Sequence, residues 1–177
     1  MTDLNPQAVA PRALLFDVFG TVVDWRSSIA REVQATLAGH PVSVDSEAFA
    51  DRWRALYQPA MARVRSGEIE FAPLDELHRE NLDQVLAEFA VDHLSESEKV
   101  QLNLAWHRLD AWPDAVVGLE RLKSRYIIGT LSNGNIALIV NMAKHSGLPW
   151  DVVLGAEVAR AYKPHPQAYL GSAQALG

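Results

Sequence analysis

Three short apolar runs stand out against the amphipathic stretches that fill the rest of the chain. They lie in residues 12–18, 126–135 and 150–155, and each leads into polar or turn-forming residues. Compact apolar runs of this length are typical of strands buried in a sheet. We therefore expect three buried strands, the first of which ends at Asp17.

The other segments carry apolar residues three and four positions apart, which is the spacing of one helix face. The expected helices cover 26–37, 45–65, 73–89, 95–109, 112–124 and 136–147, and another begins at 165. Ser95 and Glu98 have the spacing of a capping box. Pro59 is expected to bend the second helix, and Gly147 to end the sixth.

The order of these elements predicts the fold class. Strands that alternate with helices are joined by right-handed crossovers and form a parallel sheet. Residues 12–24 and 110–177 follow this alternation, whereas residues 25–109 contain only helices. We therefore expect an α/β core made of the first two ranges, with the third range inserted as an all-helical cap over the sheet.

Composition narrows the class of partner. The net charge is −6, which argues against nucleic acid or an anionic membrane as a partner, because both attract clustered Lys and Arg. The chain has no Cys, which excludes disulfides and thiolate chemistry. No apolar run approaches a membrane-spanning length and the N-terminus lacks the plan of a signal peptide, so we expect a cytoplasmic protein.

Polar groups from three separate segments follow the expected strands. Asp17 ends the first strand with Thr21 in the next turn, Ser132 and Asn133 end the second, and Lys163 follows the third. Ligands of an open parallel sheet bind beyond the carboxyl ends of its strands, so these groups should converge there. The ammonium can hold the carboxylate ionised, and the hydroxyl and amide groups can orient it and bind a ligand.

Each of these groups also has a structural explanation when it is taken alone. An Asp before a turn often caps the turn, SNG is ordinary turn chemistry, and KPHP can be a rigid loop that leads into a helix. Their convergence on one edge of one sheet favours a functional site.

The segments FDVFGT, LSNGN and YKPHP, in this order, resemble the first three motifs of the haloacid dehalogenase superfamily. The resemblance extends from about Arg12 over nearly the whole chain. Within the superfamily the sequence most resembles the type II (S)-2-haloacid dehalogenases, including members that act on fluoroacetate. The resemblance implies a Rossmann-like parallel sheet with a mobile helical cap.

The resemblance also implies roles for the strand-end residues. Asp17 would be the catalytic nucleophile. The catalytic residues around it would be Thr21, Ser132 and Lys163, and Asn133 would bind the halide.

Phe19 separates two reactions within this superfamily. Phosphatases of the superfamily resemble D-x-D-x-T, in which the second Asp protonates an alkoxide leaving group. Phe19 occupies that second position and cannot donate a proton, whereas a halide leaves as a stable anion and needs only an electropositive cradle. The sequence therefore favours carbon–halogen cleavage through an ester on Asp17, without a metal or another cofactor. A magnesium-dependent phosphatase is the alternative.

The expected cap offers groups for the halide and for the substrate carboxylate. In the dehalogenases an Arg that follows a Trp on the first cap helix binds both, and Arg54 matches that residue. Phe19 would line the same pocket, and Tyr169 matches a family Tyr near the substrate carboxylate. Arg52, two residues before Arg54, is expected to be a solvated surface residue.

The chain stops at SAQALG, where the resemblance implies a further strand and a fourth motif that positions the nucleophile and the hydrolytic water. We therefore expect a C-terminally truncated dehalogenase for small haloacids that has little turnover. An inactive remnant or interaction module is the second alternative. Relatives are often homodimers, so the resemblance implies a homodimer, for which the residues themselves give no sign.

Overall fold

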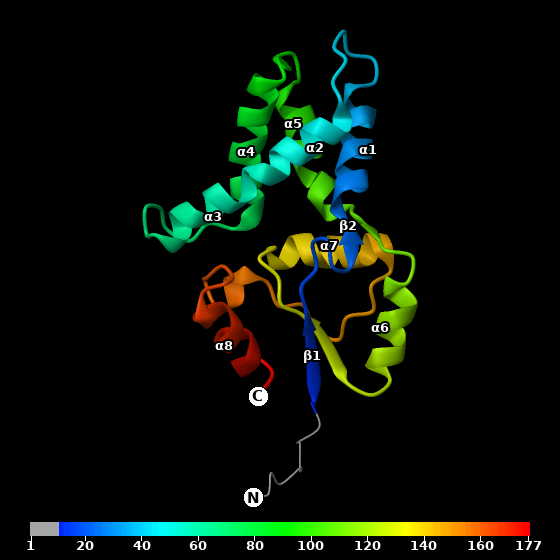
Figure 1. Ribbon diagram of the computed structural model, residues 1–177, viewed down its shortest axis with the longest axis vertical. Coiled ribbons are helices and arrows are strands. Elements are labelled where there is room, and N and C mark those ends of the chain that lie inside the picture. The colour runs from blue at the N-terminus through cyan, green and yellow to red at the C-terminus, as the bar shows by residue number, and fades with distance from the viewer. Residues whose placement is uncertain (1–10) are drawn as a thin grey trace, which may run out of the picture.

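The computed structural model describes residues 11–177 (Figure 1). The strands are β1 (Ala13–Phe16), β2 (Val23–Asp24), β3 (Asp110–Ala111) and β4 (Ile127–Thr130). The α-helices are α1 (Trp25–Leu37), α2 (Ser46–Ala55), α3 (Tyr57–Arg65), α4 (Leu74–Glu88), α5 (Glu96–Asn103), α6 (Ala115–Lys123), α7 (Ile136–Ser146) and α8 (Pro166–Gln174). Two 3-10 turns complete the described elements, η1 (Leu104–His107) and η2 (Ala156–Val158). Within this described range, no helix has the length and apolar character that a membrane crossing requires.

The predicted α/β fold with a parallel sheet is confirmed. β1 pairs with β4 in parallel, in a register that runs from Ala13 opposite Ile127 to Phe16 opposite Thr130. The two strands are joined by a long crossover, as parallel strands require. Both strands end at the same edge, so Asp17 and the loop after Thr130 lie side by side.

The third expected strand is reduced to a single parallel bridge between Gly129 and Val152. Backbone bonds remain around this bridge, from Asp151 N to Ile128 O at 2.9 Å and from Thr130 N to Val152 O at 3.3 Å. Side chains take the flanking positions: Ile128 N donates to Asp151 Oδ2 at 3.0 Å, and Leu154 N donates to Thr130 Oγ1 at 2.8 Å. The segment therefore follows β4 without forming a regular strand.

A short antiparallel pair, β2 with β3, brings the two ends of the helical segment together. Figure 1 shows α1 to α5 gathered on one side of this pair, and α6, α7 and α8 around β1 and β4 on the other. We call these two groups the helical layer and the core layer. The side chain of Asp24, at the end of β2, accepts a hydrogen bond from Ser27 N at 3.1 Å and so caps α1.

The expected single helix over 45–65 is wrong, because it is broken at Leu56 into α2 and α3. Pro59 is the third residue of α3, where a missing N–H breaks no helical hydrogen bond. The proline therefore lies near the start of a new helix and does not bend an old one. The Ser95–Glu98 capping box is confirmed, and Gly147 ends α7 with φ of 66°.

Packing between the strands predicts a measurable effect of one methyl group. A Cβ at Gly129 in β4 would lie 2.5 Å from Val152 Cγ1 and 3.1 Å from Leu15 Cδ2. Overpacking of this kind costs about 1–3 kcal/mol. Gly129→Ala should therefore lower the free energy of unfolding by about that amount, as measured by urea denaturation.

Gly118 provides the matched control, because it lies inside α6 and a Cβ there would meet nothing within 4 Å. Gly118→Ala should raise the free energy of unfolding by about 0.5–1 kcal/mol through helix propensity. Equal effects of the two substitutions would contradict the close approach at β4.

Candidate active site

Asp17 directly follows β1, and both of its carboxylate oxygens are engaged. Lys163 Nζ lies 2.7 Å from Asp17 Oδ1, and Thr21 Oγ1 donates to Asp17 Oδ2 at 2.9 Å. The Asp17 side chain is 46% exposed, while that of Lys163 is only 18% exposed. The carboxylate is thus oriented from two sides and faces solvent on a third.

The loop after β4 connects this ion pair to the helical layer. Asn133 Oδ1 accepts a hydrogen bond from Lys163 N at 2.8 Å. Asn133 Nδ2 donates to Tyr57 OH at 3.1 Å and approaches Met61 Sδ at 3.3 Å. One buried amide therefore positions the backbone of Lys163 and the first turn of α3 together.

A pocket of about 320 Å³ opens over Asp17 between the two layers. Its lining comes from the ends of both strands, from α2 and α3, and from the segment that begins α8. The lining residues are Asp17, Phe19, Arg54, Tyr57, Gln58, Asn133, Lys163, Pro164 and Tyr169. The structure thus brings together six of the eight residues predicted from the sequence, and Thr21 joins them through its bond to Asp17.

Ser132 and Tyr169 occupy different positions relative to this pocket. Ser132 is buried, and its Oγ accepts from Gly134 N at 3.0 Å, so it shapes the turn and does not line the pocket. Tyr169, on α8, lines the pocket from its open side and is 44% exposed.

Arg54, at the end of α2, supplies the positive charge on the helical side of the pocket. Its guanidinium carbon lies 3.9 Å from the centroid of the Tyr57 ring, 5.5 Å from that of Trp25 and 5.8 Å from that of Phe19. Its Nη1 is buried and has no hydrogen-bond partner among residues 11–177. A buried guanidinium N–H without an acceptor is costly, and an anion bound in the pocket would remove that penalty.

Tyr57 is a pocket residue that the sequence analysis missed. Burial raises the pKa of Tyr57, although the nearby Arg54 charge opposes the rise. The phenol is therefore neutral, and it keeps its own O–H as a donor while it accepts from Asn133. Arg54 ends α2 and Tyr57 begins α3, so the two lie on different helices and no spacing along one helix could have identified Tyr57.

Behind the pocket lies a buried aromatic cluster that fixes Phe19. The Phe19 ring meets the edge of Trp106 at a centroid distance of 6.1 Å, and Trp106 stacks on His78 at 4.3 Å. Trp53 packs edge-on against Trp106 at 5.4 Å and donates from Nε1 to His78 O at 3.0 Å. Phe19 is thus held in place by the helical layer, with no proton donor in its position.

His78 should make the stability of the protein depend on pH. Burial lowers the pKa of His78 to about 3, so the folded protein keeps this ring neutral while the unfolded chain binds a proton below about pH 6.5. The free energy of unfolding should therefore fall by about 2 kcal/mol between pH 7 and pH 5 through this residue alone.

The measurement is urea denaturation at pH 7 and pH 5 for the wild type and for His78→Leu. The variant should lose this part of the pH dependence, because leucine binds no proton in either state. An unchanged slope would contradict the neutral, buried state of His78.

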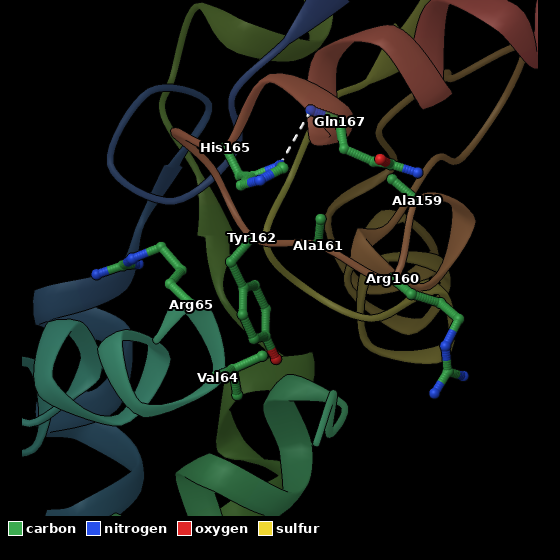
Figure 2. A pocket seen from close by; sticks show the side chains of 8 residues that line it. All are labelled: Val64, Arg65, Ala159, Arg160, Ala161, Tyr162, His165 and Gln167. Atoms are coloured by element: carbon green, nitrogen blue, oxygen red, sulfur yellow. Dashed lines mark hydrogen bonds between the residues drawn. The ribbon is translucent and has the colours of Figure 1, made fainter. Parts of the chain in front are cut away.

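A second hollow, also of about 320 Å³, lies beside the first at the tip of α3. It is lined by Val64, Arg65, Ala159, Arg160, Ala161, Tyr162, His165 and Gln167 (Figure 2). Figure 2 shows the Arg65 and Arg160 side chains pointing away from each other. Their charges do not converge, so we place the candidate active site at the Asp17 pocket.

A parallel α/β sheet with a carboxylate, an amide and an ammonium at its carboxyl edge is the architecture of an enzyme whose ligand binds at the strand ends. The family model of the haloacid dehalogenase-like hydrolases matches residues 11–177. The chain belongs to this family.

Relatives with known activities share most of this chain. An (S)-2-haloacid dehalogenase 4A from Burkholderia cepacia is 33% identical over 171 residues, which are 94% of this chain and 70% of that protein. The crystal structure of a defluorinating L-2-haloacid dehalogenase is 56% identical with a TM-score of 0.92, over 94% of this chain and 69% of that one. A third relative is an L-2-haloacid dehalogenase from Xanthobacter autotrophicus, solved with chloropropionic acid covalently bound. It is 26% identical with a TM-score of 0.79, and the match covers 94% of this chain and 65% of that chain.

Proposed function

We propose that this protein hydrolyses the carbon–halogen bond of short 2-haloalkanoic acids, with Asp17 as the nucleophile. The single observation that supports this best is the environment of Asp17. Its carboxylate is held by Lys163 and Thr21 beneath the Arg54 guanidinium, and Phe19 stands where a phosphatase would carry an acid.

The first step is a displacement at carbon. An oxygen of Asp17 attacks C2 of the haloacid, a C–O bond forms, and the C–halogen bond breaks with its electron pair leaving on the halide. The product is an ester between Asp17 and the substrate. No proton has to reach the leaving group, which agrees with the phenyl ring at position 19.

The second step returns the enzyme to its starting state. Water adds to the Asp17 carbonyl carbon of the ester, and the bond between that carbon and the substrate oxygen breaks. A 2-hydroxy acid leaves, the Asp17 carboxylate is regenerated, and one proton is released to solvent. Lys163 favours the regenerated carboxylate because it pairs with the negative charge.

Arg54 is proposed to bind the halide and the substrate carboxylate, since it carries the unpartnered buried N–H of the pocket. Asn133 is proposed to assist at the halide. In the structure its Nδ2 already contacts Tyr57 OH and Met61 Sδ, so a halide would replace one of these contacts. Tyr169 is proposed to lie near the substrate carboxylate.

The helical layer is proposed to act as the cap of this enzyme. Residues 25–109 would then form the cap, and residues 12–24 and 110–177 the core. The position of Arg54 supports this division, because the cation belongs to the helical layer and the nucleophile to the core layer.

The decisive experiment is mass spectrometry of the protein after incubation with chloroacetate, fluoroacetate or 2-chloropropionate. We expect the mass of the substrate without its halogen to appear on the peptide that contains Asp17. The ester accumulates only to the extent that its formation outpaces its hydrolysis, so free halide reports the first step where the ester is short-lived. Fluoroacetate is included because a 56% identical relative is defluorinating.

Halide release and phosphate-ester hydrolysis should be measured on the same sample. Magnesium-dependent release of phosphate without an ester or free halide would overturn the proposal in favour of a phosphatase.

A further inference from the structure

The loop that carries Asn133 is tied to the helical layer by a reciprocal pair of hydrogen bonds. Asn135 Nδ2 donates to Asp75 Oδ2 at 2.7 Å, and Asp75 N donates to Asn135 Oδ1 at 3.3 Å. Asp75 lies in the first turn of α4, and Asn135 directly precedes α7, only two residues beyond Asn133. The pair thus joins a helix of one layer to the strand-end loop of the other.

The second oxygen of Asp75 is also occupied. Asn141 Nδ2, on α7, lies 3.0 Å from His107 Nδ1, and an amide nitrogen can only donate. His107 Nδ1 therefore accepts, so Nε2 carries the proton and donates to Asp75 Oδ1 at 3.1 Å. Both oxygens of the Asp75 carboxylate thus face N–H donors.

This geometry favours a carboxylate. An amide at position 75 would present its NH₂ group to one of the two donors, so either two N–H groups face each other or His107 must change tautomer and the exposed Asn141 amide must turn. The His107 side chain is only 7% exposed and that of Asp75 29%, so water replaces a lost bond poorly. Burial raises the pKa of Asp75, but the hydrogen bonds from His107 and Asn135 outweigh it and hold the pKa below its ordinary value.

The two hydrogen bonds between Asp75 and Asn135, which we call the clamp, hold the loop that carries the Asn133 amide. Asn133 is two residues from the clamp, and it bonds Lys163 N on one side and Tyr57 OH on the other. A shift of the loop would therefore move the Lys163 backbone away from the position in which Nζ meets Asp17.

We propose that Asp75 and Asn135 are positioning residues that hold Asn133 between Lys163 and Tyr57. Their importance for dehalogenation rests on the proposed function, whereas the positioning itself does not. They touch neither the pocket nor Asp17 in the structure, so they act through Asn133.

The test exchanges the two partners. In Asp75→Asn an amide faces the N–H donors of Asn135 and His107. In Asn135→Asp two carboxylates face each other. The double variant Asp75→Asn/Asn135→Asp restores every bond: the amide at 75 donates to the carboxylate at 135 and still accepts from His107, and the N–H of residue 75 still meets an oxygen.

The readout is hydrogen–deuterium exchange of the Gly134 and Lys163 amides, with the amides of α6 as the internal reference. Each single variant should speed exchange at these two sites about tenfold relative to α6, the change expected from losing one hydrogen bond to a charged group. The double variant should return to the wild-type rate. Glu76→Gln is the matched control, because it removes an exposed charge from the same turn of α4 and should change nothing.

Unchanged exchange in both single variants would overturn the clamp, as would a double variant that exchanges as fast as the singles. If a single variant fails to fold, a folded double variant with wild-type exchange supports the clamp, and an unfolded one overturns it. Ester formation on Asp17 is measured in parallel. Absence of both the ester and free halide from the wild type would reject the proposed function, while the exchange data still decide the clamp.

Discussion

Asp17→Asn should abolish ester formation with chloroacetate and lower any halide release by about 10⁴-fold or more. A neutral amide is a far weaker nucleophile than a carboxylate, and it cannot pair with the ammonium of Lys163, which lies 2.7 Å from the carboxylate oxygen. The measurements are mass spectrometry of the peptide that contains residue 17 and chloride release in the same incubation.

Asp114→Asn is the matched control, since this aspartate is exposed and its side chain makes no capping bond at α6. It should form the ester at the wild-type rate. Halide release by Asp17→Asn at the wild-type rate would show that another group is the nucleophile.

Removal of the Arg54 charge should produce the second large effect. Arg54→Met keeps an apolar stem but leaves no donor for the halide or the carboxylate, so kcat/KM for chloroacetate should fall by about 10²–10³-fold. Bromide should also lose its inhibition, because the leaving group and the added halide share this cation. Steady-state kinetics with and without bromide tests both points.

Arg52→Met on the same helix separates this role from general loss of charge. Arg52 pairs with Glu88 at 2.6 and 2.8 Å on the surface, as expected for a solvated residue. Exposed pairs of this kind contribute about 0–1 kcal/mol, and kcat/KM should stay unchanged. Equal losses in the two variants would argue against a specific anion site at Arg54.

The sequence predicted the convergence at Asp17 because strand order alone brings the ends of parallel strands to one edge. Apolar runs located β1 and β4, and the residues just after them could then be assigned to one site. The third run keeps backbone bonds to β4 only around Val152, because Asp151 takes the N–H of Ile128 and Thr130 takes the N–H of Leu154 with their side chains. These are contacts between positions far apart in the chain. No local pattern reports such a contact.

The break at Leu56 shows a second limit of local patterns. The apolar spacing continues across Leu56, so the sequence predicted one helix. It also predicted a bend at Pro59, whereas the break lies at Leu56. The role of Tyr57 depends on this break and on Asn133, which is 76 residues away. Likewise, the partners of Asp75 come from η1 and from the loop after β4, and only the folded chain brings them together.

The hydrogen bonds between the layers also determine how a substrate reaches the nucleophile. Beside the pocket the layers are joined by the contacts of Asn133 with Tyr57, Asn135 with Asp75, and Tyr162 with Ala72. These contacts contain four hydrogen bonds, since Asn135 and Asp75 share two. At about 1 kcal/mol each, parting them costs about 4 kcal/mol, so well under about one molecule in a hundred is open at any moment. Asp17 and Tyr169 are already nearly half exposed on the open side of the pocket. If the protein acts as proposed, we therefore expect a small acid to enter through this open side of the pocket while the layers stay together.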